Sequence, residues 1–500
     1  MLKNLVISFL SKQRKKAIEK WSRTPIQSQD KILKSLIKTA KKTLFGKDHN
    51  FSKIKTYEDY KKNIPIVDYE GIKKYINKII AGEKDVLWPG RPKYFAITSG
   101  TTSGAKYIPI TTQSIPNLMG GAKDALLMYI ANTGNTSVLS GKHLFLQGSP
   151  VLDRIGGIKT GRLSGISAHH YPFFLNLTKR PSYKTNCIAD WEEKVGKIVE
   201  ETVSEDMRIL SGIPSWLQMY FEKLQERESK PIGKIFKNFK LLIYGGVSYR
   251  PYKNKFDKLI GRKIDSVEVY PASEGFFAFQ DRQESNDLLL LLNSGIFYEF
   301  ISERDYLNNK QNRISLKDVE QEVNYVLIIS TNAGLWGYNT GDTIMFTSKK
   351  PYRIVVTGRI KQFLSAFGEH VIVNDVEKAI EEACSKTKII INEFTVAPKF
   401  GSGSEKSCHE WFIDFEIEPR SLEKFAKVLD IRLQSQNKYY KDLIKGNVIN
   451  SLKIKRVLNN GFNIYMKSIG KLGGQNKIPK LSNDRTIADR LYKLNLVKNP

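Results

Sequence analysis

The stretch FAITSGTTSGAKYIPIT, which runs from Phe95 to Thr111, places seven small, polar or flexible residues between two β-forming segments. Glycines let backbone N–H groups approach an anion closely, hydroxyl groups donate further hydrogen bonds, and a lysine adds positive charge. The residues concerned are Ser99, Gly100, Thr101, Thr102, Gly104 and Lys106. The stretch is not a Walker phosphate loop, because three residues separate its glycines and Ala105 follows the second. Taken alone, it is equally consistent with an anion-binding loop and with a surface turn.

Two carboxylates follow strand-like runs farther along the chain. Glu274 lies in VYPASEG, in the turn after an apolar run, where a carboxylate can hold Mg²⁺ that is shared with substrate phosphates. Tyr270 of the same segment can lie against a planar base. Asp342 lies in YNTGD, after a Thr-Gly turn, and its two oxygens suit the paired hydroxyls of a ribose. Each carboxylate, taken singly, is more often an ordinary solvated turn residue.

Further candidate residues have weaker signals. Arg359 lies in VTGRIKQF, a turn that leads into a following small domain. Lys123, on the predicted helix NLMGGAKDALLMYIAN, can meet the carboxylate of a substrate, although core packing explains most of that helix equally well. His169 and His170 in SGISAHHYPFF are candidates near an acid pocket, although a pair of structural histidines is the commoner meaning of such a motif.

Together, in this order, these segments resemble the adenylate-forming superfamily of acyl ligases. Longer segments of the sequence narrow the resemblance to the acyl-acid amido synthetases related to the plant auxin- and jasmonate-conjugating enzymes of the Gretchen Hagen family. The segments that carry it are TSGTTSGAKYIPIT, YGGVSYRPY, YPASEGFFAFQ, FYEF and GGQNKIPK. The resemblance runs from about Lys93 to Lys480 and also fits the N-terminal helical region. As an ordered set the motifs are specific, whereas none is specific singly.

The resemblance implies a role for each matching residue. Residues that would bind the nucleotide are Ser99, Gly100, Thr101, Thr102, Gly246, Tyr270, Ala272, Ser273, Asp342 and Arg359. Glu274 would hold Mg²⁺, and Lys477 would act from the small domain during adenylation, so these two are the catalytic candidates. The chain departs from the pattern at Ser103 and Ala105, where the superfamily often has Gly and Pro, and at Lys480, which replaces a final arginine. The last departure weakens the assignment of Lys477.

The implied function is that of an ATP-dependent ligase with ATP and Mg²⁺ as cofactors. It would adenylate a carboxylic acid and transfer the acyl group to an amine, expected to be an amino acid; Lys123 and His170 are the candidates for substrate binding. An acyl-CoA ligase with a thiol acceptor is the nearest alternative. A basic nucleic-acid-binding protein with an inactive ligase fold is an alternative of another class, because the net charge is +29. The 80 basic residues are dispersed, however, so we expect small-molecule partners, no nucleic acid or membrane, and a monomer.

Composition and length limit the class of protein further. The chain has 500 residues, 41% of them hydrophobic, which predicts a globular protein of two or three domains. No run approaches the roughly 18 apolar residues of a membrane helix. The N-terminal segment has too short an apolar stretch for a signal peptide and predicts an amphipathic helix. Three widely spaced cysteines suggest a reducing compartment, and we expect a cytoplasmic protein.

The pattern of elements predicts an α/β fold. We expect a large N-terminal adenylation domain over residues 1–358, made of β-sheets or a barrel wrapped by helices. A small, mobile α+β domain would follow over 359–500, with a hinge about 358–362. Local signals predict a helix that begins after Ser114, a strand in KHLFLQG, a helix capped by Asp190, and a hairpin whose turn is Asn293 to Gly295.

Overall fold

The computed structural model of the protein describes residues 2–99, 105–171, 177–246, 249, 252–360, 363–364, 366–367, 369, 371–401, 406–472 and 477–498. The chain divides into two compact units, which are considered separately. Unit 1 comprises residues 1–213, 236–246 and 264–356, and unit 2 comprises 214–235, 247–263 and 357–500. The predicted fold class is confirmed, because a large N-terminal part and a smaller C-terminal part both mix helices and strands. The domain boundary at residue 358 stays a prediction, since unit 2 also takes in helices from the middle of the chain.

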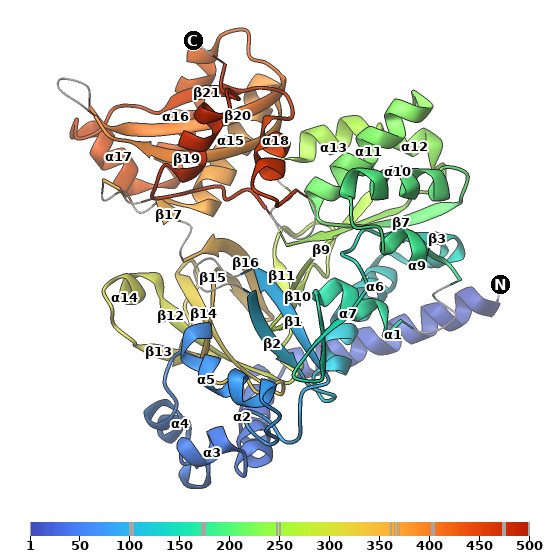
Figure 1. Cartoon of the computed structure of the whole chain (residues 1–500), viewed down its shortest axis with the longest axis vertical. Helices are drawn as coiled ribbons and strands as arrows, with labels where there is room; N and C mark the ends of the chain where they lie inside the picture. Colours follow the sequence, from blue (N-terminus) through green and yellow to red (C-terminus); the bar gives the residue numbers. More distant parts are fainter. Residues whose placement is uncertain are drawn as a thin grey trace. The chain divides into compact units, whose positions relative to one another are not determined.

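The N-terminal helices of unit 1 begin where short polar side chains satisfy free backbone N–H groups. The Asp68 carboxylate accepts from the backbone of Glu70 and Gly71, and Thr56 and Asp59 form a capping box. Figure 1 shows α2 to α5 gathered beside the strands β12 to β14. The helices of unit 1 are α1 (Leu2–Ser22), α2 (Pro25–Ala40), α3 (Leu44–Asp48), α4 (Tyr57–Asn63), α5 (Tyr69–Ile80), α6 (Ile115–Thr133), α7 (Leu163–Ala168), α9 (Tyr183–Asn186), α10 (Trp191–Thr202) and α14 (Glu303–Leu307). Short 3₁₀ turns are η1 (Phe51–Lys53), η2 (Thr136–Ser140) and η4 (Leu316–Asp318).

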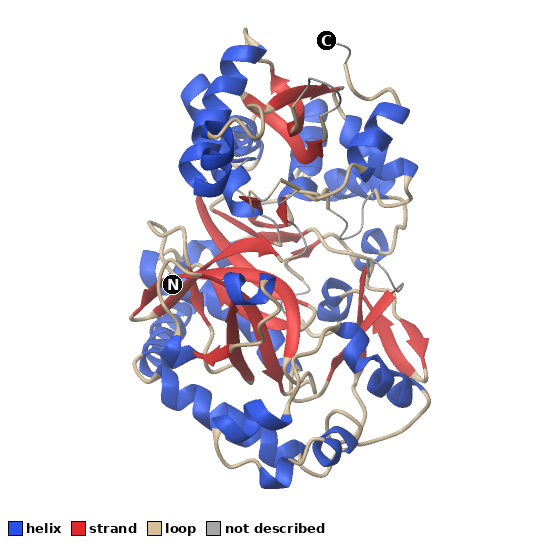
Figure 2. Ribbon diagram, turned by 90° about the vertical axis from the view of Figure 1, so that its left-hand side faces the viewer, coloured by secondary structure: helices blue, strands red, loops and turns tan. Residues whose placement is uncertain are grey.

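A twelve-stranded sheet forms the body of unit 1 in the described part of the chain, in the order β13-β12-β14-β15-β16-β11-β10-β9-β8-β7-β3-β6. The strands β6, β3, β7, β8 and β9 run parallel. Antiparallel pairs join β9 to β10, β10 to β11 and β11 to β16, and also β13 to β12, β12 to β14 and β14 to β15. The sheet curves strongly, as Figure 2 shows. Its strands are β3 (Lys142–Phe145), β6 (Lys179–Arg180), β7 (Met207–Gly212), β8 (Leu241–Gly245), β9 (Asp265–Ala272), β10 (Gly275–Phe279), β11 (Leu288–Leu290), β12 (Ile296–Ser302), β13 (Arg313–Ser315), β14 (Asn324–Thr331), β15 (Tyr338–Lys349) and β16 (Tyr352–Arg359).

A second sheet of unit 1 has four strands, in the order β2-β1-β5-β4. They are β1 (Tyr94–Ser99), β2 (Ala105–Ile110), β4 (Asp153–Ile155) and β5 (Ile158–Gly161). Strands β1 and β2 pair antiparallel, with Ser99 opposite Ala105. The polar loop found in the sequence, Gly100 to Gly104, therefore connects the two strands of a hairpin, but these five residues lie outside the described residues.

Local sequence signals predict several helices and strands correctly, but one predicted strand pairing is wrong. The helix α6 begins after Ser114, α10 follows Asp190, whose side chain accepts from the Glu193 N–H, and β3 lies in KHLFLQG. The predicted hairpin at Asn293 to Gly295 does not form, because β11 pairs with β10 and β16 whereas β12 pairs with β13 and β14. Both apolar runs are buried, so distant strands, rather than the turn between the runs, decide their pairing.

The C-terminal part of unit 2 is a three-stranded sheet, in the order β19-β20-β21, with helices packed on it. Its core contains the stacked rings of Phe394 and Trp411, with centroids 5.7 Å apart. The strands of this sheet are β19 (Ile390–Lys399), β20 (Cys408–Ile417) and β21 (Lys453–Val457), and a separate two-stranded sheet consists of β17 (Phe363–Leu364) and β18 (Val371–Ile372). The helices of unit 2 are α11 (Pro214–Glu228), α12 (Ile232–Ile235), α13 (Lys253–Ile260), α15 (Val373–Thr387), α16 (Leu422–Gln436), α17 (Lys438–Lys445), α18 (Gly461–Ser468) and α19 (Thr486–Lys493).

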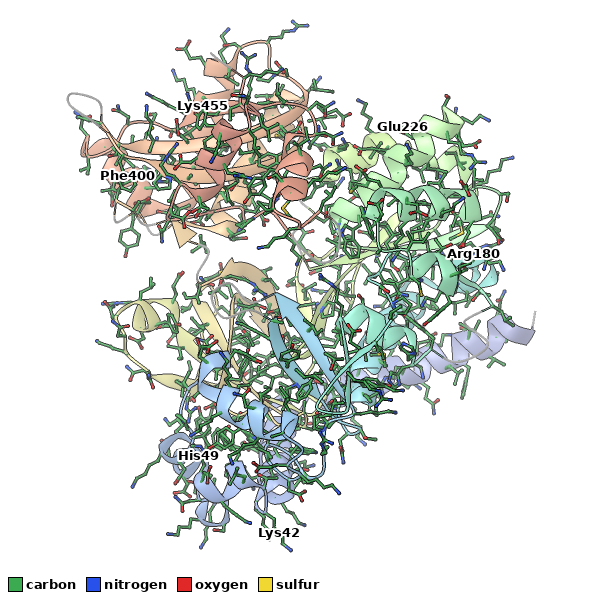
Figure 3. All side chains as sticks on the ribbon, in the orientation of Figure 1. Lys42, His49, Arg180, Glu226, Phe400 and Lys455 are labelled. Carbon is green, nitrogen blue, oxygen red and sulfur yellow. The ribbon has the colours of Figure 1, made fainter. Side chains whose placement is uncertain are left out.

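The lysines and cysteines agree with the sequence analysis, which expected dispersed basic residues and cysteines of a reducing compartment. Lysines project from both units, for example Lys42 and Lys455 (Figure 3). Cys187, Cys384 and Cys408 are free thiols. Within the described ranges, no helix has the length and apolar character needed to cross a membrane.

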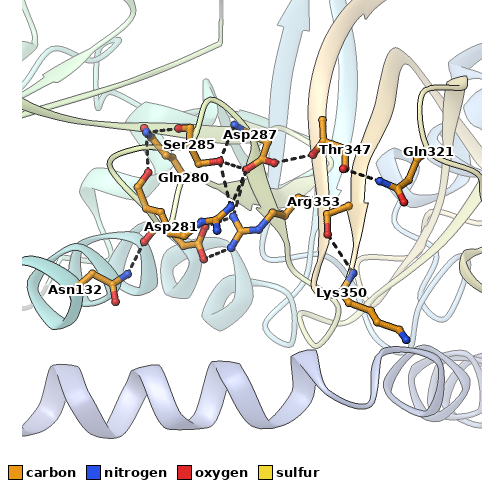
Figure 4. Close-up of polar contacts among 11 residues, drawn as sticks. Asn132, Gln280, Asp281, Ser285, Asp287, Gln321, Thr347, Lys350 and Arg353 are labelled. Atoms are coloured by element: carbon orange, nitrogen blue, oxygen red, sulfur yellow. Dashed lines mark hydrogen bonds and ion pairs between the residues drawn. The ribbon is translucent and has the colours of Figure 1, made fainter.

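A buried arginine links strands in the middle of the large sheet (Figure 4). Arg353 of β16 donates to both carboxylate oxygens of Asp281, the second at 2.6 Å, and to Asp287 at 3.3 Å. Thr347 of β15 donates to the other oxygen of Asp287 at 2.7 Å. Burial raises the pKa of Asp287, but hydrogen bonds from Ser285 and Thr347 and the charge of Arg353 outweigh it, so this pKa is lowered. The cluster thus ties β10, β11, β15 and β16 together.

Removing Arg353 tests this role. The change Arg353→Met leaves the buried Asp281 carboxylate without its cation, so we expect the free energy of unfolding to fall by about 3–5 kcal/mol. Chemical denaturation measures the loss. The matched control is Arg282→Met, because Arg282 is 52% exposed and lies 3.8 Å from Asp287. The Arg282→Met change should lower the free energy of unfolding by less than about 1 kcal/mol. Equal effects of the two changes would contradict the assignment.

Candidate active site

The carboxyl ends of the parallel strands define one edge of the large sheet. The strands β3, β7, β8 and β9 pair in parallel, so their carboxyl ends share this edge. Ligands of open α/β sheets bind at such an edge. The predicted residues Gly246, Ser273 and Glu274 follow the ends of β8 and β9. They therefore lie where a ligand site is expected.

Glu274 occupies a tight turn between β9 and β10. Ala272 pairs with Gly275 across the two antiparallel strands, so Ser273 and Glu274 alone form the turn. A Cβ at Gly275 would come within 2.6 Å of Ile296 Cδ1, so glycine lets this strand pack closely against Ile296 beside the turn. Glu274 is partly buried and adjoins a small hollow. Polar residues that share the lining are Ser114, Asn117, Ser273, Ser294, Thr331 and Asn332.

Tyr270 and Asp342 are in direct contact. The Tyr270 hydroxyl donates to Asp342 Oδ2 at 2.6 Å, and each residue is 7% exposed. Tyr270 lies in β9 and Asp342 in β15, and the strands β10, β11 and β16 separate these two in the sheet. The contact is possible only because the sheet curves. The ring of Phe277 packs edge-on against Tyr270, with centroids 5.0 Å apart, and supports it from β10.

The conformation before Asp342 depends on a glycine. Gly341 has φ +78, in the left-handed region that favours glycine. Its N–H donates to Asn339 Oδ1 at 2.8 Å, and the Asp342 N–H donates to Thr340 Oγ1 at 3.1 Å. The side chains of Asn339 and Thr340 therefore fix the backbone at Gly341 and Asp342.

The remaining predicted nucleotide-binding residues are placed as follows. Ser99 ends β1, while Gly100, Thr101 and Thr102 lie outside the described residues, so their roles stay predictions. Ala272 is the last residue of β9, and Gly246 is exposed with φ +84. Arg359 is exposed at the end of β16, within unit 2.

The two candidates for substrate binding differ in their surroundings. Lys123 is exposed on α6, next to the buried Asp124, which pairs with Arg14. His170 is partly buried, and its Nε2 lies 3.2 Å from the hydroxyl of Tyr94. Burial, followed by the charges of Lys93 and His169, lowers the pKa of His170.

Lys477 extends from a segment of unit 2 that is fixed to β19. The Val396 N–H donates to Lys480 O at 2.9 Å, the Ser482 N–H donates to Val396 O at 3.1 Å, and Thr395 Oγ1 donates to Pro479 O at 2.6 Å. Ile478 and Lys480 are buried, whereas Lys477 is exposed. The segment therefore presents Lys477 from a fixed backbone.

Lys480 has a structural role within unit 2. Its Nζ donates to the Tyr252 hydroxyl at 2.6 Å and to Glu393, and the Tyr252 hydroxyl donates to the same carboxylate. Burial, followed by the charge of Glu393, raises the pKa of Tyr252 well above its ordinary value. The sequence singled out YGGVSYRPY and GGQNKIPK but gave no signal that Tyr252 and Lys480 meet, and none for Glu393.

The residues at the turn fit a magnesium ion that is shared with phosphates. Among the described residues, no group of three or more His, Cys, Asp and Glu side chains is arranged to hold a metal. Mg²⁺ usually takes one or two carboxylates, several waters and substrate phosphates instead of a full protein cage. Glu274 lines a small hollow together with both apolar side chains and hydroxyl and amide side chains, and its carboxylate is of the type that such an ion takes.

Three family domains match the sequence. The GH3 family N-terminal domain matches residues 14–264, the central domain matches 289–359, and the C-terminal domain matches 374–486. The first of these matches alone covers half of the chain.

Curated relatives match over different lengths. The indole-3-acetic acid-amido synthetase GH3.4 of Arabidopsis thaliana is 23% identical over 445 residues, which are 74% of this chain and 72% of that protein. The indole-3-acetic acid-amido synthetase GH3.15 of the same plant is 34% identical over 91 residues, 18% of this chain and 15% of that protein. The chain thus spans less than a sixth of the latter in that match.

Solved structures share the fold over nearly the whole chain. The GH3.15 acyl acid amido synthetase of Arabidopsis thaliana in complex with 2,4-DB has a TM-score of 0.80 at 16% identity and covers 98% of this chain and 96% of that one. The 2-hydroxyisobutyryl-CoA ligase in its postadenylation state has a TM-score of 0.60 at 13% identity, with coverage of 93% and 91%.

The role of Lys480 can be tested by substitution. The change Lys480→Met leaves the Glu393 carboxylate without its cation, so we expect the segment from Lys477 to Ser482 to detach more often from β19. Hydrogen exchange should speed up at the Ser482 N–H, which donates to Val396 O. The free energy of unfolding should fall by about 3 kcal/mol.

Two further variants complete that test. Lys480→Arg keeps the charge and should restore most of the protection. Lys471→Met changes an exposed lysine of the same unit and should leave exchange unchanged. Normal protection of Ser482 in Lys480→Met would contradict the anchoring role.

Proposed function

Because the chain belongs to the GH3 family, we propose that it is an ATP-dependent ligase that adenylates a carboxylic acid and transfers the acyl group to the amine of an amino acid. The observation that carries this proposal is the contact between Asp342 and Tyr270, which lies on β9, the strand that leads into the Glu274 turn. The printed names of the relatives, amido synthetases and a 4-substituted benzoates-glutamate ligase, support the choice of an amine acceptor.

The first step makes the acid reactive. A carboxylate oxygen attacks the α-phosphorus of ATP, and pyrophosphate leaves with the electron pair of the broken P–O bond. Negative charge accumulates in the transition state, so fixed donors and cations are expected to provide most of the catalysis. In this proposal the loop from Ser99 to Thr102 binds phosphates, Asp342 binds the ribose, and Lys477 approaches the reacting phosphate.

Glu274 would hold a magnesium ion together with the phosphates. When bound, such an ion neutralises phosphate charge and orients the leaving group. Glu274 suits this task because it lies in a two-residue turn whose flanking residues, Ala272 and Gly275, are paired in the sheet.

The second step forms the amide. The amine nitrogen attacks the acyl carbon, AMP leaves, and the nitrogen loses a proton. We propose that residues 359–500 act as a mobile domain with a hinge about 358–362, so that Lys477 serves the first step and then withdraws. Gly358, with φ +144, supplies a backbone conformation that other residues rarely adopt.

We also propose a cytoplasmic, monomeric protein that acts on small molecules and binds no nucleic acid. The three free cysteines and the dispersed basic residues support this view. An acyl-CoA ligase stays the alternative, because its first step would be the same. Offering CoA and amino acids separately to the trapped acyl-adenylate distinguishes the two activities.

Replacing Glu274 tests the adenylation step. In ATP–pyrophosphate exchange over a panel of aryl and aliphatic acids, we expect exchange with at least one acid and its loss in Glu274→Ala. The control Glu70→Ala changes an exposed glutamate of α5 and should retain exchange. Full exchange in Glu274→Ala would refute the role of this carboxylate.

Replacing Lys477 tests the division of work between the two steps. Lys477→Ala should slow exchange by roughly 100-fold or more, as expected for the loss of one charged stabilising group. Aminolysis of a supplied acyl-adenylate should change far less. Lys471→Ala, an exposed lysine nearby in the sequence, should affect neither step. Equal slowing of both steps would show that Lys477 has no special part in adenylation.

A further inference from the structure

Three basic side chains lie at Gln147 and Gly148, which follow β3, without any carboxylate partner among the described residues. This cationic cluster consists of Arg162, Lys179 and Lys194. Lys194 is 2% exposed, and the other two are partly buried. Burial lowers the pKa of all three, to about 8 for each lysine. Buried charges are normally paired with an opposite charge, so an unpaired cluster of one sign is unusual.

Neutral groups around Gln147 hold the two lysines. Lys194 Nζ donates to the backbone oxygens of Gln147 at 3.0 Å and Asn186 at 2.8 Å. With the Gln147 amide oriented to satisfy its neighbours, its oxygen accepts from Lys179 Nζ at 3.1 Å. Lys179 Nζ also lies 4.1 Å from the centroid of the Tyr171 ring. These contacts orient the two ammonium groups but do not neutralise them.

Arg162 has no hydrogen bond or ion pair from its guanidinium within the described part of the chain. Its side chain lies against Gly148, where an added Cβ would come within 3.2 Å of Arg162 Cδ. Arg180, which is labelled in Figure 3, differs from Arg162 because its guanidinium pairs with the carboxylate of Glu205. The Arg162 guanidinium therefore has five N–H donors and a full charge for a ligand.

The position of Arg162 connects it with the candidate active site. Arg162 directly follows Gly161, which pairs with Ala96 in the parallel ladder of β5 and β1. It therefore lies beside the last residues of β1, the strand that leads into the predicted phosphate loop. Gly148 follows the carboxyl end of β3, the sheet edge that also bears the Glu274 turn.

We propose that the cationic cluster is a carboxylate-binding subsite, in which Arg162 binds the α-carboxylate of the acceptor amino acid. This inference rests on the proposed function and adds the residue that recognises the acceptor. A planar guanidinium matches a carboxylate in bidentate geometry, whereas the lysines supply background charge.

The charge balance of the reaction favours the acceptor over the acid as the ligand. The carboxylate of the acid loses its charge when it becomes an acyl-adenylate, whereas the α-carboxylate of the acceptor keeps its charge throughout. Positive surroundings also lower the pKa of an α-ammonium group, which favours the neutral amine that attacks the acyl carbon. A fixed cationic cluster therefore serves both binding and deprotonation of an amino acid.

The test separates recognition of the carboxylate from the rest of the reaction. The common amino acids are first offered to the enzyme loaded with an acyl-adenylate, which identifies the best acceptor. The KM for this amino acid is then compared with the KM for the amine formed by its decarboxylation, which lacks the α-carboxylate. Arg162→Met should raise the KM for the amino acid roughly 10- to 100-fold, as expected for a lost hydrogen bond to a charged group. Its KM for the amine and its ATP–pyrophosphate exchange should stay unchanged. Arg162→Lys should recover part of the preference for the amino acid over the amine.

The control is Arg154→Met, which changes an arginine on the exposed side of β4 that donates to Gly157 O at 3.0 Å. It should leave both acceptors unaffected. An unchanged preference for the amino acid in Arg162→Met overturns the inference, and so does a loss of exchange, which would assign Arg162 to ATP, pyrophosphate or the acid. Absence of exchange in the unaltered protein with every acid would instead refute the proposed function, and the inference with it.

Discussion

The contact between Tyr270 and Asp342 depends on the curvature of one large sheet. Three strands lie between β9 and β15, so a flat sheet would keep the two side chains apart. Arg353, paired with Asp281 and Asp287, ties together strands that lie between β9 and β15 in the sheet. This buried ion pair lies outside the candidate active site, but it joins strands that separate Tyr270 from Asp342.

Buried charges in structural positions have partners that those in the candidate binding position lack. Arg353 and Lys480 each have carboxylate partners that satisfy them within the fold. Arg162 and Lys179 lie partly buried without such partners among the residues that the structure describes. Because an unpaired buried charge destabilises the folded protein, its presence at the edge of the sheet suggests that a ligand supplies the missing charge. This contrast is the physical basis for assigning an anion-binding role to one cluster and a structural role to the others.

Local features of the fold follow from the sequence, whereas long-range contacts do not. The Asp190 cap and the turn at Glu274 depend on neighbouring residues, so short motifs predict them. The pairing of β11 and β12 is decided by distant strands, and the predicted hairpin between them is therefore wrong. The meeting of Tyr252 with Lys480 joins positions 228 residues apart. Arg162 gave no signal in the sequence, because what distinguishes it from other arginines is that no partner lies among the described residues of the folded chain.

The central claim is that the Glu274 turn, Asp342 and the loop after Ser99 surround a single nucleotide. A crystal structure of the protein with Mg²⁺ and a non-hydrolysable ATP analogue tests this most directly. The account predicts the ribose hydroxyls on Asp342, the metal on Glu274 and the phosphates at the loop, all around one bound molecule. A nucleotide bound elsewhere, or Asp342 and Glu274 both remote from it, would contradict the account.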